Sequence, residues 1–103
     1  MTAGAVSSSD EVALTVSSCF LDALPRNVAA TIVALRKTPR AEESEIVLRL
    51  MEIGFVPGEQ VRVIAHGFPG REPIAVRVGG RATFALRAHE ATLVEVRPVQ
   101  EGA

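Results

Sequence analysis

Three side chains of this sequence could bind a soft metal ion or act as nucleophiles: Cys19, His66 and His89. They lie far apart along the chain, and none forms a pair with the C-x-x-C or H-x-x-x-H spacing of a zinc site. His89 stands beside Glu90, a pair that could hold a metal only weakly at a surface. We therefore expect exposed histidines, no metal site and no cofactor.

The sequence also lacks the patterns that carry catalysis. It contains no G-K-[ST] phosphate-binding loop, and no nucleophile stands near an identifiable base. The glycines of segment 67–70 fit a turn between strands better than a phosphate loop. We expect a protein that is not an enzyme.

Charge and aromatic content argue against nucleic acid as a partner. The formal net charge is −1, so no positive field attracts polyanions. The chain has four Phe and neither Trp nor Tyr, which leaves little with which to build a platform for bases or proline-rich peptides. Binding to another protein remains as the expected activity.

The same composition indicates where the chain works. No apolar run approaches the roughly 20 residues that span a bilayer, so we expect no insertion into a membrane. The N-terminal segment lacks the basic region of a signal peptide and carries Asp10 and Glu11 instead. A lone cysteine fits a reducing compartment. These features predict a cytoplasmic protein.

Polar side chains that alternate with core residues are the first candidates for partner contacts. Arg62 and Arg77 lie on predicted strands and should point outward, as a solvated face or as an interface. Arg87 could pair locally with Glu90 or contact a partner. Two apolar residues after a predicted helix could add an exposed patch. The candidate partner-binding set is Phe55, Val56, Arg62, Arg77 and Arg87.

These residues need a scaffold, and the chain has room for one domain. Residues 1–24 are small, Ser-rich and weakly patterned, which predicts a flexible N-terminal tail. Residues 25–98 form the domain, and 99–103 a C-terminal tail. The apolar run at 28–35 predicts the first strand.

An amphipathic helix is expected over residues 42–53. Ile46, Leu50 and Ile53 recur at helical spacing, and Val47 and Met51 widen the apolar stripe. Acidic residues at its start suit the helix dipole. The helix N-cap is either Thr38 or Ser44, and both fit.

A tight corner follows the predicted helix. Gly54 stands where the helix needs a left-handed residue to end, and Phe55 is placed to pack back on Leu50. Pro57 and Gly58 suit the central positions of a type II turn.

The remainder of the domain is β, with strands expected near 60–65, 74–78, 82–86 and 92–96 and a helical turn at 87–91. A three-residue loop at 79–81 is required, because only an odd loop keeps one face of the hairpin apolar. It pairs Val78 with Ala82, Val76 with Phe84 and Ile74 with Leu86. About five short strands predict a small β-barrel with one inserted helix, whose strand edges could allow self-association.

Three blocks, RLMEIGFVPGEQVRV, EPIAVRVGG and FALRAHEATLVEV, resemble the FeoA family of bacterial ferrous iron transport proteins. The resemblance covers roughly residues 25–97, with an N-terminal tail longer than that family needs. It implies an SH3-like barrel with a helical insertion and an accessory role beside a GTP-dependent, FeoB-type ferrous iron transporter of the inner membrane. The motif positions are Leu50, Gly54, Pro57, Gly58, Pro73 and Leu86.

Two roles compatible with this resemblance follow. The chain is either an adaptor that docks on the transporter, or a regulatory module similar to the C-terminal domain of metal-dependent transcriptional repressors. The second role needs a helix-turn-helix and metal ligands, which the residues before the barrel cannot supply.

Overall fold

Six antiparallel strands, two α-helices and one 3-10 helix make up the part of the chain that the computed structural model describes, residues 17–67, 70 and 72–99. In chain order they are β2 (Cys19–Phe20), η1 (Leu21–Ala23), β3 (Ala29–Leu35), α2 (Ala41–Glu52), β4 (Gln60–His66), β5 (Ile74–Val78), β6 (Ala82–Leu86), α3 (Ala88–Ala91) and β7 (Val94–Pro98). The prediction of a mainly β domain with one inserted helix is confirmed.

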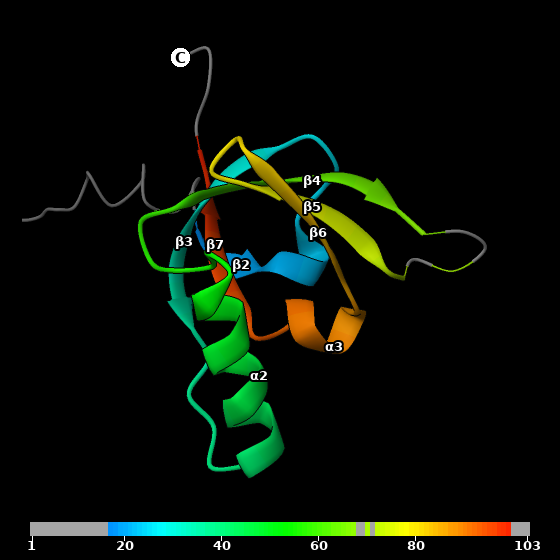
Figure 1. Ribbon diagram of the computed structural model, residues 1–103. Helices are drawn as coiled ribbons and strands as arrows, with labels where there is room; N and C mark the ends of the chain where they lie inside the picture. The colour runs from blue at the N-terminus through cyan, green and yellow to red at the C-terminus, as the bar shows by residue number, and fades with distance from the viewer. Residues whose placement is uncertain (1–16, 68–69, 71, 100–103) are drawn as a thin grey trace, which may run out of the picture.

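The strands form one sheet in the order β2-β7-β3-β4-β5-β6. Figure 1 shows this sheet curling around a common interior, with α2 projecting below it and α3 beside β6. The interior is filled by aliphatic side chains that alternate along the strands, as a sheet with one buried face requires. They include Ala30, Ile32, Val61, Val63, Val76, Val94 and Val96.

The hairpin of β5 and β6 has the predicted register. Val78 pairs with Ala82, Val76 with Phe84 and Ile74 with Leu86, across a three-residue loop. Ile74, Val76 and Val78 are buried, so the odd loop keeps the apolar side chains of the hairpin on the core side.

The corner after α2 also forms as predicted. The Phe55 N–H donates to the Leu50 carbonyl at 2.9 Å and the Gly54 N–H to the Met51 carbonyl at 3.1 Å, the bonds of a Schellman ending. Gly54 has a φ of 119° and Gly58 one of 93°, which only glycine adopts without strain. The Glu59 N–H closes the turn around Pro57 on the Val56 carbonyl.

The start of α2 differs from both proposed caps. The N-cap is Arg40, which has no side-chain capping bond. Thr38 instead accepts a hydrogen bond from the Arg40 N–H and donates one to Glu43, while the Ser44 hydroxyl donates to the Thr38 carbonyl at 3.2 Å. The polar residues therefore fasten the loop before the helix to its first turn.

The predicted N-terminal tail, residues 1–24, includes residues that belong to the domain. Cys19 and Phe20 pair with Val96 and Glu95 of β7, which raises the strand count from about five to six. Leu21, the first residue of η1, and Leu24, its C-cap, are 0% and 1% exposed. The rest of the predicted tail, residues 1–16, lies outside the described residues, as do residues 100–103 of the C-terminal tail.

The last strand begins two residues later than predicted, at Val94 rather than Thr92. The helical turn of α3 continues through the intervening residues, because the Thr92 N–H donates to the Ala88 carbonyl and the Leu93 N–H to the Glu90 carbonyl. Within the described residues, no helix is long and apolar enough to cross a bilayer.

Candidate functional site

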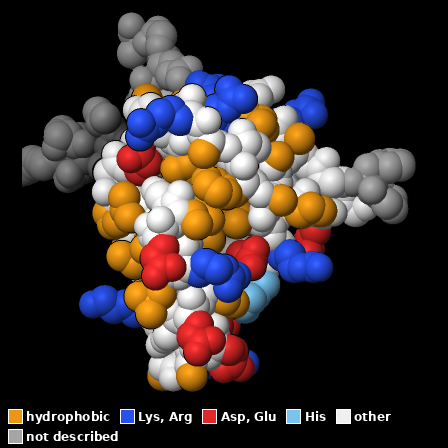
Figure 2. Space-filling view, viewed as in Figure 1, with side chains coloured by type: hydrophobic (Ala, Val, Ile, Leu, Met, Phe, Trp, Pro, Cys, Tyr) orange, Lys and Arg blue, Asp and Glu red, His pale blue; other side chains and the backbone are white. Residues whose placement is uncertain are grey.

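Helix α2 leaves part of its apolar surface uncovered. Leu50 is its one buried residue. Leu48 is 61% exposed, Met51 40% and Ile53, the C-cap, 36%. The space-filling view shows hydrophobic side chains continuing from the helix onto the barrel beside it (Figure 2). Contiguous apolar surface of this kind is a common mark of an interaction site.

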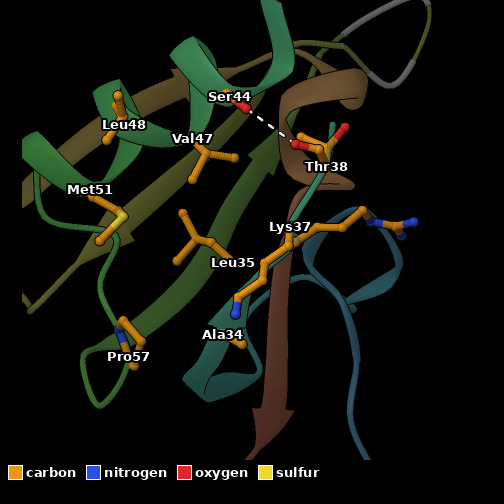
Figure 3. A pocket seen from close by; sticks show the side chains of 10 residues that line it. Ala34, Leu35, Lys37, Thr38, Ser44, Val47, Leu48, Met51 and Pro57 are labelled. Carbon is orange, nitrogen blue, oxygen red and sulfur yellow. Dashed lines mark hydrogen bonds between the residues drawn. The ribbon is translucent and has the colours of Figure 1, made fainter. Parts of the chain in front are cut away.

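A groove of about 680 Å³ runs between α2 and the end of β3. The side chains of Val47 and Met51 point from the helix toward Leu35 on the strand, and Pro57 closes one end (Figure 3). The complete lining is Ala34, Leu35, Arg36, Lys37, Thr38, Ser44, Val47, Leu48, Met51 and Pro57. Its size is that of a pocket for a few side chains of a partner.

Local hydrogen bonds hold the walls of the groove. The Ser44–Thr38 bond, drawn in Figure 3, ties the helix to the loop that follows β3. The Arg36 N–H donates to the Leu93 carbonyl at 2.7 Å, and its guanidinium lies 4.2 Å from the ring centre of Phe20. These contacts hold the loop after β3, which carries the polar residues of the lining, in place against the helix and the rest of the fold.

Arg36 and Lys37 both line the groove, and because the Arg36 guanidinium lies against Phe20, the charge at the mouth comes from Lys37. It is exposed, it lines the mouth, and no described residue forms an ion pair with it. Its aliphatic stem extends past Leu35 in Figure 3. An apolar channel with a cation at its rim suits a ligand that joins aliphatic side chains to a carboxylate.

Ion pairs connect other side chains of α2 to α3. Arg49 Nη2 lies 3.2 Å from Glu90 Oε2, and His89 Nε2 lies 3.6 Å from Glu43 Oε2. Both carboxylates thus have side-chain partners, and the Glu43 carboxylate also accepts a hydrogen bond from Thr38, which lines the groove.

Phe55 does not form the exposed patch that the sequence analysis proposed. It is 0% exposed, and its ring centre lies 6.0 Å from that of Phe84. The Schellman ending turns the chain back over the helix and aims this ring into the core. Val56 is half-buried, with its N–H donating to the Gly54 carbonyl. The exposed apolar surface comes from α2 instead.

Arg62 and Arg77 face each other on β4 and β5, pointing outward as predicted. Arg62 Nη1 donates to the Asn27 carbonyl at 2.6 Å. The hollow around them also includes Ala29, at the opposite end of β3 from the groove. The structure therefore does not bring these arginines together with the apolar groove.

Arg87 uses its backbone, not its guanidinium, to bind Glu90. Its N–H donates to Glu90 Oε1 at 2.9 Å, and Arg87 Nη1 lies 4.0 Å from Glu72 Oε1. The proposed side-chain pair of Arg87 with Glu90 is replaced by this capping bond. Because both members of the Arg87–Glu72 pair are largely exposed, it adds little stability.

The motif positions support the fold. Leu50 and Leu86 are 1% and 3% exposed. Pro73 directly precedes β5, and the two glycines and Pro57 shape the corner described above. Among the described residues, no three His, Cys, Asp or Glu side chains cluster as metal ligands.

Cys19 is half-buried on β2. Burial raises the pKa of its thiol, and the Asp22 carboxylate raises it further. Because the thiolate is the reactive form, we expect iodoacetamide to alkylate Cys19 more slowly in the folded protein than in denaturant at pH 8. Asp22→Asn should speed the folded-state reaction, measured by mass spectrometry. Equal rates in folded and unfolded protein would contradict this assignment.

The sequence analysis missed Leu48 and Lys37 as site residues. Leu48 falls outside the helical stripe of Ile46, Leu50 and Ile53, and Met51 was placed at its margin. Together they widen the apolar arc beyond what one face of a helix can bury. That excess width was the signal present in the sequence.

Comparison with known proteins identifies the family. The FeoA domain model matches residues 19–98. FeoA of Stenotrophomonas maltophilia, crystallised with zinc and described as an SH3 domain protein, is 41% identical, with a TM-score of 0.66 over 76% of this chain and 88% of that one. Iron(II) transport protein A of Clostridium thermocellum is 33% identical, with a TM-score of 0.64 over 79% of this chain and 46% of that one. The comparison with curated proteins gives no match.

A manganese-dependent transcriptional repressor shares the fold at 19% identity, with a TM-score of 0.67 over 82% of this chain and 43% of that one. At that identity the likeness concerns the fold alone. The expected SH3-like barrel is confirmed by the similar FeoA structures. The extent of the family match and the identity to FeoA proteins together show that this chain belongs to the FeoA family.

Proposed function

We propose that this chain is an accessory protein of ferrous iron uptake that docks, through the α2 groove, on the cytoplasmic part of a GTP-dependent ferrous iron transporter. Family membership supports the process, since the S. maltophilia relative is described as a candidate activating factor for bacterial ferrous iron transport. The groove with its exposed Leu48 and Met51 is the observation that carries the docking surface.

The proposed mechanism is differential binding, without catalysis by this chain. A docked protein changes a transporter only by stabilising one of its conformations over another. An apolar groove with a cation at its rim can supply that difference by binding a segment exposed in a single nucleotide state. The zinc bound by the S. maltophilia protein is not carried over, since the described residues offer no three-ligand cluster.

Substitution of the groove tests the proposal. The double variant Leu48→Ser/Met51→Ser should weaken binding to the transporter at least tenfold, because each buried aliphatic side chain contributes about 1.5–3 kcal/mol. Its thermal stability should change little, because both side chains are well exposed. The measurement is the affinity of purified protein for the transporter in nanodiscs, with and without a GTP analogue.

Glu45→Ser is the matched control. It places the same residue on the same helix, at an exposed position outside the groove lining. It should leave the affinity unchanged. Equal affinities of the double variant and the wild type would move the docking site elsewhere, and failure of the wild type to bind would overturn the proposed function. Capture of a metal-dependent repressor system instead would favour the regulatory alternative.

A further inference from the structure

We propose that residues 10–16 of this chain, DEVALTV, occupy the α2 groove in the free protein and must be displaced before a partner docks. The displacement rests on the proposed function, but occupancy of the groove does not. The inference follows from three properties of the described residues: an apolar lining, a cation at the mouth, and a short path from the start of β2.

The segment matches the groove in chemistry. In an extended chain Val12, Leu14 and Val16 lie on one face, because successive side chains point to opposite sides. The groove presents aliphatic side chains from α2 and β3 to such a row. No other stretch of the first 16 residues places three aliphatic side chains at this spacing.

The charges are complementary as well. Asp10 and Glu11 directly precede the aliphatic row. Lys37 stands at the mouth without an ion pair among the described residues, and the Glu43 carboxylate is already bonded to Thr38 and lies 3.6 Å from His89 Nε2. A carboxylate next to Lys37 would give this groove cation the ion pair that it lacks among the described residues.

The path from segment to groove is short. Phe20 of β2 lies against Arg36, which itself lines the groove. Leu14 is six residues before Phe20, a separation that spans up to about 20 Å. A tether of that length gives the segment an effective concentration of about millimolar, enough for weak contacts to keep the groove occupied.

The methionines allow a direct test in the full-length protein. The chain has two, Met1 and Met51, and Met51 lines the groove. With methyl-13C methionine, the Met51 resonance should shift in Leu14→Ser and in Asp10→Lys/Glu11→Lys. Adding Lys37→Glu to the charge-reversed variant should return the resonance toward its wild-type position, since the ion pair is then restored with opposite signs.

Val6→Ser is the control, an aliphatic substitution in the same part of the chain outside the segment; it should leave the resonance in place. An unchanged Met51 resonance in both Leu14→Ser and Asp10→Lys/Glu11→Lys overturns the proposal. A shift that vanishes on dilution also overturns it, because the occupant is then a second copy of the chain.

The displacement step is tested by measuring how tightly the Leu14→Ser variant binds the transporter. Leu14→Ser should raise the apparent affinity for the transporter by the inverse of the fraction of molecules whose groove was free, about two- to tenfold if the segment had occupied about half to nine tenths of them. Unchanged transporter affinity, with the Met51 shift present, overturns the displacement step. The Met51 measurement needs no transporter, so failure of the proposed function and failure of the segment to dock are distinguishable.

Discussion

Phe55→Ala should lower the free energy of unfolding by about 3–5 kcal/mol, the range for truncating a buried aromatic side chain. The ring is 0% exposed and lies against Phe84 in the core. The Schellman bonds use backbone atoms and survive the substitution, so the loss isolates the ring. Since domains are typically stable by about 5–15 kcal/mol, this loss is a large share of the total. Urea denaturation followed by circular dichroism measures the change.

Leu48→Ala provides the comparison, because Leu48 is 61% exposed. Its unfolding free energy should stay within about 0.5 kcal/mol of the wild type. The two variants therefore separate a core role from a docking role. A Phe55→Ala protein of wild-type stability that no longer bound its partner would restore the exposed patch first expected from the sequence.

Local chemistry explains why the corner after α2 was predictable. A helix that ends at a glycine followed by an apolar residue has few alternatives, and Pro57-Gly58 fixes the next turn. The β5–β6 register was equally determined, since a one-residue slip would expose Val76 and bury Thr83. In both cases neighbouring residues held all the information.

The beginning of the domain depended on distant residues instead. A two-residue strand has too little sequence to show alternation, and β2 exists because β7 offers it an edge to pair with. Leu21 and Leu24 are buried by elements far along the chain. The pattern of the first 24 residues alone therefore does not indicate that Leu21 and Leu24 are buried.

The groove was hidden for a related reason. Sequence periodicity tells which helix residues are apolar, whereas exposure depends on how closely the barrel approaches the helix. Helix α2 touches the core through Leu50 and the partly buried Ile46, which leaves Leu48 and Met51 uncovered. The candidate docking surface therefore depends on how α2 packs against the barrel. It lies away from Arg62 and Arg77.

The consequence for function is that one small domain separates its scaffold from its candidate docking surface. The motif residues stabilise the barrel and the corner, and they are the residues that carry the family resemblance. The groove beside α2 is lined mostly by other residues, of which only Pro57 belongs to the motif. Variation in that lining could therefore change a partner without changing the fold.

Leu21→Ala should lower the free energy of unfolding by about 2–5 kcal/mol, the second-largest effect expected here. Leu21 is 0% exposed although it lies within the predicted tail, where truncation would cost nothing measurable. The adjacent Asp22 is exposed, so Asp22→Ala should remain near wild-type stability in the same urea titration. A Leu21→Ala protein as stable as the wild type would return residues 19–24 to the tail. A large loss makes them part of the barrel, where β2 pairs with β7 and Leu21 and Leu24 fill the core.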